Sequence, residues 1–511
     1  MQLRFVVLLM GLAARRLQKR RAPPALPQRG LDAATLARLA AATRKLERSY
    51  AAPTPGDTVR YYASREPSLG RRALGIARLP LTLGASVGRT ARAAATEPPP
   101  RRFSARALPD GASLVASRPG ARRFLCERVV HPFVRQLLGD HDMFGSAASR
   151  ALSPEARAAR VARLRAATDF LGGAHNLIAP VFLKGRLGLD GGVAATRLDV
   201  DGAPDDAYYA WFEPTGTPRL NGTLVYLHGG GFIIGSKSTN GEMVARIAAA
   251  CGVRTLFVAY RKLPEAPFPG ALVDALRGVG VALASTPPER LIVGGDSAGA
   301  SLALAALHFL RETLQITPAA GLLLSPMVDI ASELEYATDT TNVGPDLLPA
   351  GFDPAARREF MDMYRGSSSN ATLDALVDAL RRRRDGALLS PLAASPRQLG
   401  ALPPLLCQAG GSEVLLDSQL RFCDAARRAG ADVRCTVFDG EVHAFHAFGF
   451  SPAWPAARAD LRRFCERALR PAAPAAPPKS HANLKSHAVV AALVGGSRKR
   501  AAVAAGIRAF R

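Results

Sequence analysis

The 511-residue sequence has few acidic and few aromatic residues. Its 42 Asp and Glu residues stand against 67 Lys and Arg residues, which gives a formal net charge of +25 and suggests a protein that binds polyanions. Aromatic residues make up only 6% of the chain, and the basic first 120 residues contain no interleaved aromatic platform and no recognised nucleic-acid-binding module. The sequence therefore predicts no nucleic-acid partner.

Cysteine is also scarce, and its spacing excludes two kinds of site. None of the cysteines forms a Cys-x-x-Cys pair or has a His at a metal-ligand spacing, so neither a zinc site nor a disulfide framework is predicted. We expect most of them to be small buried side chains and no metal to be bound. The six are Cys126, Cys251, Cys407, Cys423, Cys435 and Cys465.

The positive charge is confined to the two ends of the chain. Residues 1–200 hold 34 basic and 13 acidic side chains, and residues 471–511 hold 7 basic and no acidic ones. Residues 201–470 hold 26 basic and 29 acidic side chains, a balance of −3. The sequence thus predicts a basic Ala-, Arg- and Pro-rich extension over residues 1–120 and a basic tail over 471–511.

Long apolar runs are missing as well. The N-terminal run from Phe5 to Ala14 has ten residues, whereas a helix needs about 20 to span a bilayer. The basic cluster that follows it opposes normal export, since export signals carry their positive charge before the apolar run. The acid-poor composition up to about residue 108 favours either an organelle transit peptide or a disordered arm. Localisation stays open, with organelle targeting and membrane association as the two alternatives.

After the extension, two patterns of apolar residues indicate the fold. Apolar residues recur at helical spacing in residues 122–138 and 154–171, which predicts a helical cap segment over 121–190. The helices either pack on the next domain or form a mobile cap whose amphipathic face contacts lipid. From residue 191 to 470, short apolar runs alternate with helical stretches, which predicts an α/β domain with a mostly parallel sheet and helices on both faces. The expected strands are Thr223–Leu227, Arg254–Tyr260, Arg290–Val293, Gly321–Ser325, Pro404–Ala409 and Ala431–Phe438.

A Gly-x-Ser-x-Gly motif, residues 295–299, lies between a predicted strand and a predicted helix, Ala298–Leu314. A serine on such a strand-to-helix turn has a strained backbone, and small neighbours let the two elements approach each other. The turn lifts the hydroxyl of Ser297 clear of the sheet, close to the helix N-terminus. The motif therefore predicts a nucleophilic serine.

A second loop predicts donors for a developing oxyanion. His228 is followed by three glycines, Gly229, Gly230 and Gly231, directly after the strand Thr223–Leu227. Consecutive glycines allow the backbone N–H groups to turn inward, and the amide of Ala298 adds a further donor. The spacing fits neither a phosphate loop nor a dinucleotide fingerprint. We expect His228 to orient the loop rather than to act as a base.

Ser297 also needs a base and a carboxylate to hold that base. Downstream, His443 follows the strand that ends at Phe438, and His446 competes with it three residues later. Glu413 follows the strand Pro404–Ala409 most closely, while Asp417 has the position of a helix cap or first turn. The favoured catalytic set is Ser297, His443 and Glu413, with Asp417 as the alternative acid.

These motifs resemble the hormone-sensitive-lipase-like family of α/β-hydrolases, carboxylesterases and lipases marked by His-Gly-Gly-Gly and Gly-Asp-Ser-Ala-Gly. The resemblance covers about residues 196–469. It includes the Tyr-Arg-Lys-Leu-Pro-Glu stretch at 260–265, Ser325-Pro326 and Ser390-Pro391-Leu392. It implies an α/β-hydrolase fold with an N-terminal helical cap, ester hydrolysis without cofactor or metal, and oxyanion donors in the glycine loop. Most members carry Asp where Glu413 stands, which weakens the acid assignment but not the expected activity.

The predicted function is therefore a serine carboxylic-ester hydrolase that works through an acyl-enzyme. One alternative is a non-catalytic binding protein of the same fold, as in plant gibberellin receptors, where the base residue is lost. Another is an arylacetamide-type deacetylase. The expected partner is a small-molecule or lipid ester, with peripheral membrane contact through the basic extensions or the cap. Acyl length and oligomeric state are left open.

Overall fold

A computed structural model describes residues 219–330 and 386–470 most fully. The described residues are 30–49, 111–116, 160–169, 193–198, 207–214, 219–330, 346–348, 360–361, 363–365 and 386–470, with a few isolated positions between them. The apolar run 5–14, most of the segment 121–190 and the tail 471–511 lie outside these residues.

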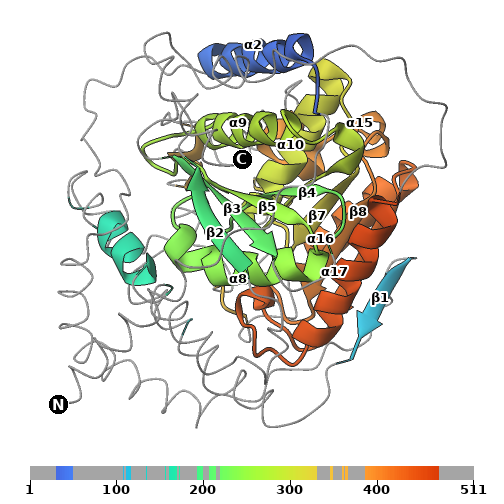
Figure 1. Cartoon of the computed structure of the whole chain (residues 1–511). Coiled ribbons are helices and arrows are strands. Elements are labelled where there is room, and N and C mark those ends of the chain that lie inside the picture. Colours follow the sequence, from blue (N-terminus) through green and yellow to red (C-terminus); the bar gives the residue numbers. More distant parts are fainter. Residues whose placement is uncertain are drawn as a thin grey trace.

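The described residues form a nine-stranded sheet whose order is β1-β9-β8-β7-β6-β4-β5-β3-β2 (Figure 1). Adjacent strands are parallel except where β3 pairs antiparallel with β2 and β5. The sheet is therefore mostly parallel, as predicted. The strands are β1 (Ala112–Val115), β2 (Val193–Leu198), β3 (Tyr208–Pro214), β4 (Thr223–Leu227), β5 (Arg254–Ala259), β6 (Leu291–Asp296), β7 (Ala320–Leu324), β8 (Leu405–Gly410) and β9 (Val433–Phe438).

Helices cover both faces of this sheet (Figure 1). On one face, α9 (Gly270–Leu283), α10 (Ala298–Leu314) and α16 (Leu416–Arg428) contribute to the larger apolar core. On the other face, α8 (Lys237–Cys251) and α17 (Trp454–Ala468) pack over a second core. Because β4, β6, β7 and β8 are buried along their whole length, their continuous apolar runs follow from helices on both sides.

Shorter helices lie between these elements. The four-residue α14 (Gly386–Leu389) and the capped α15 (Pro396–Gly400) precede β8. Single 3-10 turns occur at Pro288–Arg290, Pro391–Ala393 and Phe445–Ala447, the last of them just after His443. These short helices connect the strands and the long helices, and they do not form part of the two helical layers.

Two folded elements lie within the segment predicted as a basic extension. The helix α2 (Ala33–Ser49) packs on α9, and its residues Leu36 and Leu39 are fully buried in the larger core. The strand β1 pairs in parallel with β9 at the sheet edge. Parts of the first 120 residues therefore complete the α/β domain.

Of the predicted cap, residues 160–169 are helical and dock on the α/β domain. Arg165 forms a two-pronged ion pair with Glu265, at 2.6 and 2.9 Å, and also donates to the carbonyl oxygens of Ile233 and Leu263. This helical segment is thus held both to the chain that follows the glycine loop, at Ile233, and to the turn after β5, at Leu263 and Glu265. Among the helices that the structure describes, none is both long and apolar enough to cross a membrane.

Candidate active site

Ser297 lies on a strained turn between β6 and α10. Its backbone has φ 52° and ψ −123°, values that a side-chain-bearing residue rarely adopts. A Cβ on Gly299 would clash with the carbonyl oxygens of Leu227 and His228, so only glycine lets the helix start this close to the end of β4. The amide of Ser297 donates to the carbonyl of Leu324 on β7 at 2.9 Å, which holds the turn at the sheet.

His443 reaches this serine from the turn that follows β9. Its Nε2 lies 2.8 Å from Ser297 Oγ, although 146 positions separate the two residues. Both side chains are nearly buried, with residue exposures of 5% and 8%. The distance is within hydrogen-bond reach, so this imidazole can accept the hydroxyl proton.

Glu413 lies on the far side of the imidazole. Its Oε2 is 3.0 Å from His443 Nδ1 and accepts a further bond from Gln419 Nε2 at 2.8 Å. Its Oε1 accepts bonds from Ser325 Oγ and the Gly410 amide, each at 2.5 Å. This fully buried carboxylate therefore has donors on both oxygens, as a buried charge requires.

Asp417, the alternative acid, occupies a different place. It lies in the first turn of α16 and is only partly buried, where a carboxylate favours the helix N-terminus. The structure thus brings Glu413, and not Asp417, to the imidazole.

The electrostatic surroundings of His443 favour its charged form. Burial lowers the pKa of this imidazole, but the hydrogen bond and charge of Glu413 and the charges of Asp346 and Asp296 outweigh it, so the pKa lies above the ordinary 6.5. An imidazole with a raised pKa holds a transferred proton well and is a stronger base.

The other buried histidines among the described residues are neutral and packed. His446 contacts Gln408 at 3.0 Å, and burial lowers its pKa to about 3. Burial likewise lowers the pKa of His228 to about 3 and that of His308 to about 4. His228 stacks on Tyr260 with ring centroids 4.2 Å apart, and its Nδ1 lies 2.7 Å from the Gly229 carbonyl. It packs within the loop and is not aimed at Ser297.

The glycine loop requires one correction of the predicted donors. The Gly229 amide donates to Asp296 Oδ1 at 3.0 Å, so it is already occupied and does not face a substrate. In contrast, the amides of Gly230, Gly231 and Ala298 have no acceptor among the described residues. Gly230 has φ +115°, which only glycine adopts freely, and its carbonyl accepts the amides of the next turn.

Asp296 fixes this loop from the residue just before the nucleophile. Its Oδ1 accepts both the Gly229 amide and the hydroxyl of Tyr226 on β4, the latter at 2.8 Å. Burial raises the pKa of Asp296 to about 6, although these hydrogen bonds act in the opposite direction. The serine turn and the glycine loop are thus joined through one side chain.

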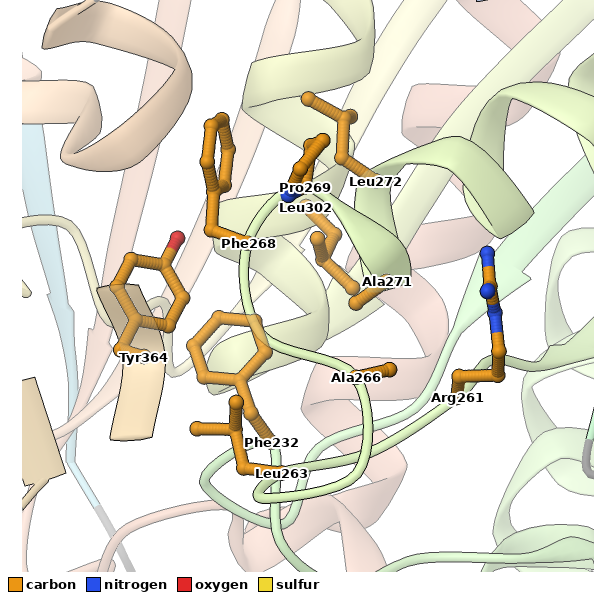
Figure 2. Close-up of a pocket in the computed structure, with 10 residues that line it drawn as sticks. All are labelled: Phe232, Arg261, Leu263, Ala266, Phe268, Pro269, Ala271, Leu272, Leu302 and Tyr364. Atoms are coloured by element: carbon orange, nitrogen blue, oxygen red, sulfur yellow. The ribbon is translucent and has the colours of Figure 1, made fainter. Parts of the chain in front are cut away.

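A small apolar cavity lies beside the loop, and Figure 2 shows the side chains around it. Phe232 directly follows the glycines, and Leu302 lies on α10 one and a half turns after Ser297. The empty space between its side chains, counted together with the open solvent at its mouth, is about 240 Å³. Its lining is Phe232, Arg261, Leu263, Ala266, Phe268, Pro269, Ala271, Leu272, Leu302 and Tyr364.

Among the described residues, one cluster has the side chains of a metal site. The sulfur atoms of Cys407, Cys423 and Cys435 lie within 4.8 Å of one another. The three come from β8, α16 and β9, so no spacing in the sequence could have revealed the cluster. All three are fully buried in the larger apolar core and none contacts the catalytic side chains, which is how small core residues behave.

Sequence reasoning missed several polar partners of the site. Ser325, Gln419 and Asp346 each hydrogen-bond a predicted site residue or its backbone, and Tyr226 bonds Asp296, the residue before the nucleophile. Ser325 stood in a recognised Ser-Pro motif, but nothing in that motif indicated its partner. Asp346 comes from the stretch between β7 and β8, which carries no strand or motif signal.

Comparison with known proteins agrees with this architecture. Residues 224–447 match a family model described as an α/β-hydrolase fold. An acetyl-hydrolase of Streptomyces hygroscopicus is 34% identical over 251 residues, which cover 48% of this chain and 75% of that protein. An esterase of Acinetobacter venetianus is 29% identical over 47% of this chain and 73% of its own length. A crystal structure of a mutant of the esterase E40 is 29% identical, with a TM-score of 0.50 over 66% of this chain and 97% of that one.

The mostly parallel sheet, its two helical layers and the serine turn define the α/β-hydrolase class of enzyme. The chain belongs to the α/β-hydrolase family of these esterases and acetyl-hydrolases, the hormone-sensitive-lipase-like group. It is an enzyme of the esterase type, as the sequence motifs predicted.

Proposed function

We propose that the protein hydrolyses carboxylic esters through a covalent acyl-enzyme on Ser297. The single observation that supports this most is the line of contacts from Ser297 Oγ to His443 Nε2, at 2.8 Å, and from His443 Nδ1 to Glu413 Oε2, at 3.0 Å. A nucleophile, a base and an orienting carboxylate in hydrogen-bond reach of one another have the geometry of serine catalysis.

The reaction follows from these contacts. Ser297 Oγ attacks the ester carbonyl while His443 Nε2 takes its proton, and Glu413 stabilises the imidazolium that forms. His443 then returns the proton to the departing alcohol, and Ser297 keeps the acyl group. A water molecule, activated by the same imidazole, attacks the acyl-enzyme and releases the acid. The raised pKa of His443 suits a group that must hold a proton between these steps.

The oxyanion formed in each step needs donors that are already in place. The amides of Gly230, Gly231 and Ala298 are proposed for this role, because they come from the loop and the turn that meet around Ser297. Their lack of another acceptor within the described residues leaves them available to the substrate. Such preorganised donors contribute about 3 to 4 kcal/mol each to lowering the barrier in serine hydrolases.

We further propose that the substrates carry short acyl groups. The apolar cavity beside Phe232 and Leu302, which follow the glycine loop and the serine turn in the sequence, is the candidate pocket for such a group. One relative is named an acetyl-hydrolase, which points to the same size class. Short-chain p-nitrophenyl esters are therefore the first substrates to test.

The test compares Ser297→Ala with the unmodified protein on p-nitrophenyl acetate. We expect hydrolysis to be lost to the background rate while circular dichroism and the urea midpoint are retained. Ser285→Ala, which changes a serine at the end of α9, is the matched control and should keep full activity. Undiminished hydrolysis by Ser297→Ala would refute the mechanism.

A fluorophosphonate probe separates this proposal from a non-catalytic binding role. Stoichiometric labelling of the unmodified protein, absent in Ser297→Ala, is expected for an active nucleophile. A protein that binds ester ligands but is never labelled and never turns them over would be a receptor-like member of the fold.

A further inference from the structure

Asp346 is a buried carboxylate that accepts three backbone amides, two from separate distant loops and one from the next residue in the chain. Its Oδ1 accepts the amide of His443 at 2.7 Å and that of its neighbour Leu347 at 2.7 Å. Its Oδ2 accepts the amide of Val414 at 2.9 Å. The residue is only 1% exposed, and the side chain of Leu347 packs in the second core.

The two long-range donors belong to the catalytic loops themselves. One is the backbone of the proposed base, His443, and the other belongs to Val414, the residue directly after the proposed acid. In sequence, Asp346 is 68 positions from Val414 and 97 positions from His443. A single side chain from the stretch between β7 and β8 thus fixes the spacing of the loops that carry Glu413 and His443.

The charge of this carboxylate also acts on the imidazole. Three carboxylates face His443, namely Glu413 at Nδ1, Asp346 behind its backbone and Asp296 on the serine side, and each of them favours the imidazolium. His446 is held neutral because burial lowers its pKa, and the buried carboxylate of Glu441, two residues before His443, accepts the amide of Ala453. Burial raises the pKa of Asp346 to about 6, so above that pH its removal would withdraw one of three negative charges together with two long-range backbone bonds.

We propose that Asp346 is a positioning residue for ester hydrolysis, which holds the acid and base loops in register and stabilises the protonated state of His443. The inference rests on the proposed function of Ser297, His443 and Glu413. It assigns a role to a residue that touches neither the substrate nor the reacting atoms.

Two substitutions distinguish the effect of the hydrogen bonds of Asp346 from the effect of its negative charge. Asp346→Asn keeps one carbonyl oxygen, which can accept the amides that Oδ1 accepts now, but it has no charge and presents an N–H₂ group to the other donor. Asp346→Ala loses all three bonds. We expect kcat to fall about tenfold in Asp346→Asn and about 100-fold in Asp346→Ala, with KM changed little, since a misplaced catalytic group costs up to about 10² in rate.

The decisive measurement is the pH dependence of kcat/KM. A purely structural role for Asp346 would not shift its acid limb in a predictable direction. Loss of the negative charge lowers the pKa of His443, so the acid limb of kcat/KM shifts to lower pH in both variants. Rates are expressed per active site, counted by complete fluorophosphonate labelling, so that unfolded molecules do not contribute. The imidazole pKa of His443, followed by NMR and identified through its absence in His443→Asn, should fall in Asp346→Asn.

The control is Asp460→Asn, another buried carboxylate, which lies on α17 and accepts bonds from Gln408 and Thr436. It should lose folding stability but keep kcat per labelled site and the acid limb. If both Asp346 variants keep the unmodified kcat and acid limb, the positioning role is wrong while the hydrolase mechanism stands. If the unmodified protein neither turns over esters nor accepts the probe, the proposed function is wrong, and the NMR comparison still tests the effect of Asp346 on His443.

Discussion

Ser325 Oγ donates a hydrogen bond to Glu413 Oε1 at 2.5 Å. The same hydroxyl accepts the amide of Ala444, the residue after His443, at 3.0 Å. Ser325 follows β7, whereas Glu413 follows β8 and Ala444 follows β9. A single hydroxyl therefore ties together the ends of three neighbouring strands where the acid and the base meet.

Replacing Ser325 with Ala should slow hydrolysis without unfolding the protein. The change removes a donor to a buried carboxylate, and hydrogen bonds to charged groups contribute about 1.5 to 3 kcal/mol. We expect kcat for p-nitrophenyl acetate to fall about tenfold or more. Ser390→Ala, which removes another buried hydroxyl bonded to a carboxylate, should keep the unmodified kcat. Equal kcat values in the two variants would contradict the proposed contribution of Ser325.

The assignment of the acid can be tested with two isosteric changes. Glu413→Gln removes the charge beside His443 Nδ1 and can hold the imidazole in the wrong tautomer, so kcat should fall by about 10³ to 10⁴. Asp417→Asn changes a carboxylate in the first turn of α16 and should have nearly normal kcat. Steady-state kinetics on the two variants decide the question. A larger loss in Asp417→Asn would reverse the assignment.

The pH profile should show an acid limb above pH 6.5. The base must be neutral to take the proton, so activity is lost as the pH falls through the pKa of His443. Burial lowers that pKa, but Glu413, Asp346 and Asp296 raise it above the ordinary value of 6.5. The profile of kcat/KM reports this group in the free enzyme. An acid limb centred below pH 6 would show that burial outweighs the three carboxylates.

Arg165 should anchor the described part of the cap. Arg165→Ala removes a two-pronged ion pair with Glu265 and the donors to the carbonyls of Ile233 and Leu263. We expect amide hydrogen exchange in residues 160–169 to become about tenfold faster, which corresponds to about 1.4 kcal/mol of local stability. Arg163→Ala is the matched control, because its side chain is exposed on the same helical segment. Equal exchange in both variants would exclude an anchoring role.

Much of the fold could be predicted because its central strands are continuous apolar runs with clear ends. β4 and α10 have the predicted bounds, and the other central strands differ from the predicted ranges by one to three residues at an end. The strands β1, β2 and β3 were not predicted. β1 has only four residues, two of them exposed, and its stability comes from β9, more than 300 residues away. The residues of β1 alone do not indicate that a strand so far away in the sequence pairs with them.

The site was predictable wherever a residue follows a strand or stands in a glycine motif. Ser297, Glu413 and His443 meet because parallel strands deliver their C-terminal ends to one edge of the sheet. The prediction that the Gly229 amide is an oxyanion donor was wrong because a sequence does not show that the carboxylate of Asp296 accepts that amide. Asp346 stayed hidden because its two distant partners are backbone amides, which every residue except proline possesses.

The edge position of β1 sets a practical limit on how the enzyme can be shortened. A version that began at residue 121 would keep every proposed catalytic residue, yet it would leave the hydrogen-bonding groups along one side of β9 without their strand partner. It would also uncover the apolar surface of α9 that Leu36 and Leu39 now shield. Open strand edges template intermolecular pairing, so such a version would be prone to aggregation. Recombinant work on this hydrolase should therefore retain the residues from α2 onward.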